Sequence, residues 1–279
     1  MNILFFGSSE YSVIILKALL KADYHLSMVT TPDQPQARST KLLPNPVKTF
    51  CQTHKLPFTT NHKQSFKTDL IISADYGLKI SDQTLKSARL GALNLHPSLL
   101  PKYRGATPVP RAILAGDTNT GISIIQMTNK IDAGPILIQK IVNIKPNDTS
   151  PDLLTRCFTL GTKLLIKTLP QYIEHKITPK PQPSQSPTPY SQRFTKQDGF
   201  ITWLDFIKSL KTNGQTLHNQ IRALYPWPGT YTTMPNKKTL KILSSQLKAN
   251  QLLPLSVQLE GKNPISWQQF KTGYQHLLQ

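Results

Sequence analysis

Short apolar runs alternate with amphipathic stretches along the first two-thirds of the chain. The first apolar run, residues 2–6, ends at a Gly/Ser turn, and apolar residues then follow at helical spacing from Val13 to Leu20. A strand, a tight turn and a helix in this order open an α/β unit, and Ser8 or Ser9 can cap the helix. Further strand-like runs lie at 26–30, 69–73, 91–95, 121–127 and 136–142, and helical patterns at 107–115 and 152–174.

This alternation predicts an α/β fold with a largely parallel sheet and helices on both faces. In such a fold, ligands bind beyond the carboxyl ends of the strands. The turn after residue 6 reads Gly-Ser-Ser-Glu-Tyr-Ser and lacks the second and third glycines of the dinucleotide fingerprint. The sequence therefore gives little support to NAD binding at this turn.

A proline-rich segment at 178–192 interrupts the pattern. Its five prolines exclude a helix or a central strand, so we predict a semi-rigid interdomain linker. Beyond it, one helical pattern covers 203–225, a turn follows at Tyr225–Gly229, and strand-like pieces lie at 230–233, 239–244 and 252–260. We therefore predict one domain over 1–177, the linker, and a small, mostly-β second domain over 193–279.

The charge of the chain changes this picture by suggesting a partner. Over 279 residues the formal net charge is +19, of which +11 falls in residues 1–180 and +8 in the shorter remainder. Clustered cations gain affinity for a polyanion by releasing its counterions, so the excess favours nucleic acid. A generally basic proteome, or solubility, would also account for it.

Cysteine and histidine usage limits the chemistry. Two cysteines, Cys51 and Cys157, cannot build a disulfide framework, and the seven histidines lack metal-ligand spacing. The amino terminus has no basic region followed by a long apolar one, and no apolar stretch is long enough to span a bilayer. We expect a cytoplasmic protein with no membrane segment and no metal.

Two polar motifs follow predicted strands and are the candidates for catalysis. Asn94 and His96 end one strand, where residues two apart share a face, and a loop with two prolines follows them. Asp132 follows the next strand, two positions before Gly134. If the two loops are neighbours, an amide, an imidazole and a carboxylate converge. A satisfied structural histidine and a plain Asp-x-Gly turn are the alternative interpretations.

Such a trio suits transfer of an acyl-type group from a carbonyl donor to an amine. The amide of Asn94 and an N–H of His96 can stabilise the oxyanion of the tetrahedral intermediate. Asp132 would orient His96 and help to remove the proton from the attacking amine. This chemistry needs no Ser or Cys nucleophile.

Taken together, these motifs resemble those of the 10-formyltetrahydrofolate-dependent formyltransferases. The resemblance rests on Asn-x-His, on Ser-Leu-Leu-Pro-x-Tyr-Arg-Gly over 98–105, and on Asp-x-Gly, in that order. The opening run, the loop at 31–35 with 44–48, residues 196–203 and residues 219–229 are also similar. Two features depart from the family pattern. Asp75 stands where the family has a small apolar residue, and the second domain is abbreviated between Leu243 and Leu255.

The resemblance implies a Rossmann-like formyltransferase domain joined to a small OB-like β-barrel domain. It implies formyl transfer from 10-formyltetrahydrofolate to the amino group of initiator methionyl-tRNA, with no metal or nucleotide, by a monomer. By matched position, Asn94, His96 and Asp132 are the catalytic group. The loop at 31–47 would approach the acceptor stem, with Arg38 and Lys41 as tRNA contacts. The implied folate-binding residues are Tyr76, Ser98, Leu99, Leu100, Pro101 and Gly134.

Two other functions stay open at this point. Family members that formylate an amino sugar or glycinamide ribonucleotide share the trio, although the basic second domain argues against those acceptors. A catalytically inactive tRNA-binding protein is the alternative outside enzymes. Two departures motivate it: residues 36–41 of the 31–47 loop stand where the family is richer in glycine and basic residues, and the second domain is abbreviated.

Overall fold

The computed structural model describes residues 1–35, 42–62, 64 and 66–278. By their contacts, the residues divide into two compact units. The first comprises Met1–Ala106, Thr120–Val142 and Leu154–Tyr190, and the second comprises Thr107–Asn119, Asn143–Leu153 and Ser191–Gln279. The continuous domain limits expected from the sequence, 1–177 and 193–279, stay a prediction beside this division.

A seven-stranded sheet forms the centre of the first unit. Its first five strands, in the order given below, run parallel, and the sixth pairs antiparallel with the fifth, which confirms the mostly parallel sheet. A two-stranded hairpin, β3 (Gln34–Pro35) with β4 (Leu42–Leu43), stands apart from it. The strand order of the large sheet is β5 (Phe58–Thr59), β2 (His25–Val29), β1 (Asn2–Phe6), β6 (Leu70–Ala74), β7 (Ala92–His96), β8 (Asn119–Gln126) and β9 (Ile136–Asn143).

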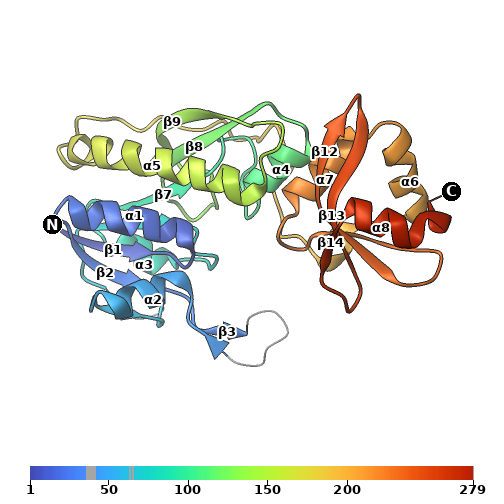
Figure 1. Ribbon diagram of the computed structural model, residues 1–279. Helices are drawn as coiled ribbons and strands as arrows, with labels where there is room; N and C mark the ends of the chain where they lie inside the picture. Colours follow the sequence, from blue (N-terminus) through green and yellow to red (C-terminus); the bar gives the residue numbers. More distant parts are fainter. Residues whose placement is uncertain (36–41, 63, 65, 279) are drawn as a thin grey trace. The chain divides into compact units, whose positions relative to one another are not determined.

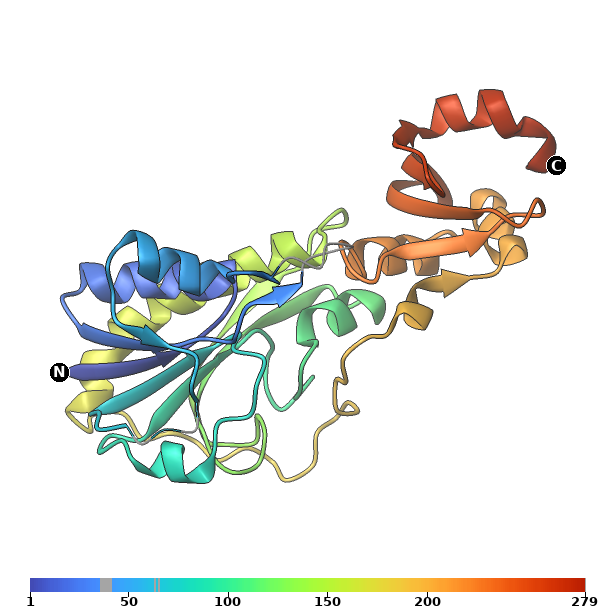
Figure 2. The same ribbon diagram turned by 90° about the horizontal axis from the view of Figure 1, so that it is seen from below.

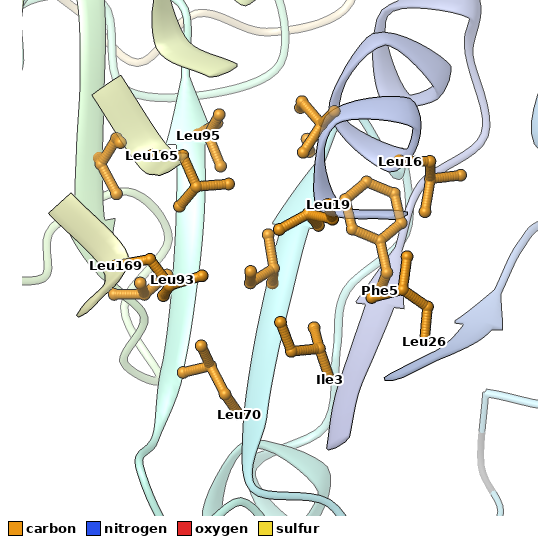
Figure 3. Close-up of a cluster of buried hydrophobic side chains, with 14 of the residues drawn as sticks. Ile3, Phe5, Leu16, Leu19, Leu26, Leu70, Leu93, Leu95, Leu165 and Leu169 are labelled. Carbon is orange, nitrogen blue, oxygen red and sulfur yellow. The ribbon is translucent and has the colours of Figure 1, made fainter. Parts of the chain in front are cut away.

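Helices cover both faces of this sheet (Figures 1 and 2). Helices α1 (Glu10–Lys21), α2 (Pro46–Thr53) and α5 (Ser150–Ile173) pack on one face, and the short α3 (Asp82–Lys86) lies on the other. Ser9 caps α1 with its side chain, as its position before the helical pattern suggested. Apolar side chains of α1 and α5 meet those of the strands in one cluster (Figure 3). Each fully buried Leu or Ile there contributes about 1.5–3 kcal/mol.

The second unit is mostly β, as expected, and has its own core. Its five-stranded sheet follows the order β10 (Phe200–Ile201), β11 (Thr230–Thr233), β12 (Thr239–Lys248), β13 (Gln251–Leu259) and β14 (Pro264–Ser266). Phe206, Trp267 and Phe270 form an aromatic centre in that core. Helices α4 (Pro108–Leu114), α6 (Trp203–Lys211), α7 (Gln215–Ala223) and α8 (Trp267–Tyr274) complete the unit, with one-turn helices at Lys196–Gly199 and Gln275–Leu277.

Two features of the second unit differ from the sequence expectations or add to them. The helical pattern over 203–225 is divided between two helices, because α6 ends at Lys211 and α7 begins at Gln215. Between the two helices, Gly214 passes close to β13. A Cβ at this position would lie 2.2 Å from the backbone nitrogen of Leu252, so only glycine fits there. Within the stretch expected to be abbreviated, Ala249 and Asn250 join β12 and β13 in a two-residue turn, both with positive φ.

No helix in the described part of the chain is long and apolar enough to cross a membrane.

Candidate active site

Strand β7 places Asn94 and His96 on one face of the sheet. Leu93 and Leu95 point into the cluster beneath α1 and α5 (Figure 3), so the alternating residues face the other way. In the register, Asn94 lies opposite Ser73 of β6, and His96 lies opposite Ser123 of β8. The expectation that Asn94 and His96 share a face is confirmed.

Asp132 joins them from the connection between β8 and β9. Its Oδ2 lies 3.6 Å from His96 Nδ1, and its Oδ1 accepts a hydrogen bond of 3.3 Å from Asn94 Nδ2. Its Oδ2 also accepts from the backbone N–H of Gly105 at 2.9 Å. The side chains of His96 and Asp132 are only 5% and 11% exposed. The structure thus brings together the amide, imidazole and carboxylate expected from the sequence.

The second ring nitrogen of His96 is held by the backbone. Its Nε2 lies 3.0 Å from the carbonyl oxygen of Tyr103. Because a carbonyl only accepts, Nε2 carries the proton in this contact. The neutral ring therefore presents an acceptor at Nδ1, towards Asp132, and only the imidazolium form donates from that nitrogen.

Both loops that meet His96 have unusual backbone geometry. Tyr103 and Asp132 have φ values of 60° and 52°, in the left-handed region that side-chain-bearing residues rarely adopt. Two residues after Asp132, a Cβ on Gly134 would lie 1.8 Å from the carbonyl oxygen of Gln126. Glycine is required at that position for the loop to pass the end of β8.

Hydrogen bonds within the expected folate-binding loop and to Ser123 of β8 hold this loop in place. Ser98 and Leu100 are buried, and Ser98 Oγ donates to the carbonyl oxygen of Lys102 at 2.7 Å. Ser123 Oγ donates to the carbonyl oxygen of Ser98 at 2.6 Å and accepts from the backbone N–H of Leu100 at 3.2 Å. These side chains fix the loop, and the folate contacts expected of Ser98, Leu99, Leu100 and Pro101 stay a prediction.

Tyr76 follows β6 at the same edge of the sheet. Its ring packs edge-on against Phe6 with ring centroids 5.1 Å apart, and burial raises the pKa of Tyr76 to about 12. Its hydroxyl is buried with no hydrogen-bond partner among the described residues. Ser8 Oγ donates to the Tyr76 carbonyl at 3.0 Å, and this bond ties the first turn of the chain to the loop after β6. The exposed Asp75, which departs from the family pattern, lies between β6 and Tyr76 with φ 48°.

The expected tRNA contacts Arg38 and Lys41 lie outside the described residues. On the described flanks of this loop, Lys48 Nζ pairs with the Asp33 carboxylate at 2.7 Å, and Asn45 caps α2. Over the described ranges, no group of three or more His, Cys, Asp or Glu side chains could hold a metal ion.

The proline-rich segment reaches the site, which sequence reasoning missed. Gln182 Nε2 donates to the carbonyl oxygens of Asp132 and Gly134, at 2.9 and 2.7 Å. A glutamine in a proline-rich segment carries no signal of such a role, and only the five prolines marked the segment as extended.

Comparison with known proteins now gives the family. The formyl transferase family model matches residues 1–169, and the model for the formyl transferase C-terminal domain matches residues 193–254. The chain is 35% identical over 254 residues to methionyl-tRNA formyltransferase of Staphylococcus epidermidis, covering 88% of this chain and 79% of that protein. The same enzyme of Dehalococcoides mccartyi is 37% identical over 257 residues, with coverage of 88% and 79%.

Solved structures share the fold at lower identity. Methionyl-tRNA formyltransferase from Clostridium thermocellum gives a TM-score of 0.62 at 16% identity, covering 93% of this chain and 98% of that one. An N-formyltransferase from Helicobacter canadensis, in complex with folinic acid and dTDP-3-aminofucose, gives 0.67 at 21% identity, with coverage of 88% and 87%. The chain belongs to the formyl transferase family, which includes these methionyl-tRNA formyltransferases.

Proposed function

We propose that this chain transfers the formyl group of 10-formyltetrahydrofolate to the free amino group of methionyl initiator tRNA. The observation that carries the proposal is the convergence of Asn94, His96 and Asp132 on one face at the end of β7. The similarity to methionyl-tRNA formyltransferases over most of the chain supports the acceptor. As part of the same proposal, the enzyme acts in the cytoplasm as a monomer and needs no metal or nucleotide.

The reaction begins with attack of the methionyl amine on the formyl carbon of the donor. The tetrahedral intermediate carries an oxyanion, for which two donors are at hand. Asn94 Nδ2 donates one N–H to Asp132, and its second N–H can donate to the oxyanion. His96 can donate from Nδ1 in its imidazolium form. One such donor lowers the barrier by roughly 2.7–4 kcal/mol.

Asp132 has the part of proton acceptor and electrostatic partner. Its carboxylate faces His96 Nδ1 and is fixed by the Gly105 N–H and the Asn94 amide. From there it orients the ring of His96 and takes up the proton of the attacking amine, directly or through water. Collapse of the intermediate breaks the bond between the formyl carbon and N10 of the folate, and that nitrogen takes up, directly or through water, the proton that Asp132 removed from the amine.

Tyr76, Gly134 and residues 98–101 are the proposed folate wall, and Arg38 and Lys41 the proposed contacts to the acceptor stem. The charge of +8 in residues 181–279 gives the tRNA backbone a further partner. The buried hydroxyl of Tyr76, without a partner among the described residues, is a donor that a bound ligand can satisfy.

A second acceptor class follows from the structural relatives, several of which are sugar N-formyltransferases. The deciding assay offers the purified protein 10-formyltetrahydrofolate with either initiator methionyl-tRNA or a dTDP-amino sugar. We expect formyl-methionyl-tRNA and no formylated sugar. Formylation of the sugar alone would reassign the acceptor, and tight tRNA binding without turnover would identify an inactive tRNA-binding protein.

A further inference from the structure

We infer that Gln182 and Thr188 are positioning residues that hold the two loops on either side of His96 in their active arrangement. They belong to residues 180–190, here called the strap, an extended segment of the first unit (Figure 2). The strap lies between the two regions that the family models match, residues 1–169 and 193–254. The inference rests on the proposed function for its assay.

Gln182 uses both ends of its amide. Its Nε2 donates to the carbonyl oxygens of Asp132 and Gly134, at 2.9 and 2.7 Å. Its Oε1 accepts from Arg104, at 3.1 Å from Nε and 2.8 Å from Nη2. Arg104, 9% exposed, also donates to the carbonyls of Pro183 and Ser184. One side chain thereby joins the Asp132 loop to the loop that follows His96.

Thr188 holds the second loop from the other end of the strap. Its Oγ1 accepts from the backbone N–H of Tyr103 at 2.7 Å. Nearby, Ser186 Oγ donates to the carbonyl oxygen of Pro101 at 2.7 Å. The carbonyl of Tyr103 is the group that binds His96 Nε2, so Thr188 acts on the ring of His96 through a single residue.

Among the residues that the strap holds are both residues with positive φ that contact His96. Tyr103, at φ 60°, meets Nε2, and Asp132, at φ 52°, meets Nδ1. Side-chain-bearing residues keep such a backbone only where surrounding contacts impose it, and they concentrate at functional sites. Gln182 and Thr188 supply those contacts, so they set the distance between His96 and Asp132 without touching a reactant.

The test compares the same chemical change at two glutamines of the strap. Gln182→Glu keeps an acceptor for Arg104 but turns a carboxylate oxygen towards two carbonyls, which removes both donated bonds. Gln185→Glu adds the same charge at an exposed side chain three positions away. Two measurements separate the two consequences: single-turnover formylation of methionyl-tRNA at saturating enzyme gives a rate constant that reports positioning, and thermal unfolding reports the stability of the fold.

We expect Gln182→Glu to lower the rate constant about 100-fold, as a misplacement near 1 Å does, while Gln185→Glu matches wild type. Thr188→Val should also slow the reaction, and Thr188→Ser, which keeps the hydroxyl, should restore it. If Gln182→Glu does not fold, the Thr188 pair decides by the same criteria. A lower melting temperature with an unchanged rate constant would overturn the inference and leave the strap a purely structural segment. Failure of wild type itself to form product would instead overturn the proposed function.

Discussion

Asn94 donates a hydrogen bond of 3.3 Å to Asp132, although the two residues are 38 positions apart in the chain. Strand β8 lies between them in sequence and runs antiparallel to β7, so its last residue, Gln126, pairs with Leu93 rather than with His96. The loop after β8 therefore reaches back along β7 to bring Asp132 to the end of that strand. The proposed mechanism depends on this return of the loop.

The charge of Asp132 is the first point to test. Asp132→Asn keeps the size of the side chain but turns an NH2 group towards one of its two donors, the Asn94 amide or the Gly105 N–H. We expect the rate of formyl transfer to fall by about 10²–10⁴-fold, the usual contribution of acid–base catalysis. Steady-state assays measure it. Asp82→Asn, at an exposed carboxylate in the first turn of α3, is the matched control and should keep full activity.

The shape of the same loop is tested at Gly134. Gly134→Ala places a Cβ 1.8 Å from the Gln126 carbonyl, so the loop has to move and Asp132 moves with it. We expect a loss of roughly 1–3 kcal/mol of stability, as for other overpacked sites, together with slower turnover. Thermal unfolding and the formylation assay check the two effects. Gly273→Ala, in α8 with nothing within 4 Å, should be neutral or slightly stabilising. Equal behaviour of the two variants would contradict this account of the loop.

Side-chain alternation was enough to predict half of the site. Leu93 and Leu95 are apolar and buried, so Asn94 and His96 had to share the opposite face. The approach of Asp132 could only be stated as a condition, because it depends on the direction of β8 and on the path of a loop. The similar order of motifs in a known family supplied what the pattern could not.

Long-range packing explains what the sequence did not reveal. The helical pattern over 203–225 is interrupted before α7, where β13, far along the chain, lies against Gly214. The five prolines of the 178–192 segment indicated an extended chain but not the surface on which it packs. The hydrogen bonds of Gln182 and Thr188 depend on that surface, and no periodic pattern in the sequence predicts them.

A pH-dependent stability follows from His218 in the second unit. Its Nε2 lies 3.0 Å from the Pro146 carbonyl and its Nδ1 3.0 Å from Ser245 Oγ. Desolvation by burial, with a smaller effect of the Arg222 charge, lowers the pKa of His218 below its ordinary 6.5. The unfolded chain therefore binds the proton more readily, and the free energy of unfolding should fall as the pH drops below about 6.5.

Urea unfolding at pH 5, 6 and 7 measures that dependence. His218→Gln should weaken it, and His276→Gln, at an exposed histidine, should leave it as in wild type. The same pH dependence in the wild type and in His218→Gln would show that other groups cause it.

The basic character of the chain predicts that its affinity for the acceptor depends on salt. With a net charge of +19, binding of tRNA should release counterions, so the KM for methionyl-tRNA should rise steeply with salt. A logarithmic plot of that KM between 50 and 200 mM salt, about the range over which such contacts weaken strongly, measures the number of phosphates neutralised. An amino-sugar acceptor, or a flat plot, would speak against a tRNA surface.

The central claim is that Asn94, His96 and Asp132 carry out formyl transfer to methionyl-tRNA. Its most direct test is single-turnover formylation of initiator methionyl-tRNA with 10-formyltetrahydrofolate, by wild type and by His96→Ala. We predict transfer by wild type and a rate at least about 100-fold lower for His96→Ala. Equal rates in the two proteins, or no transfer by wild type, would contradict the claim.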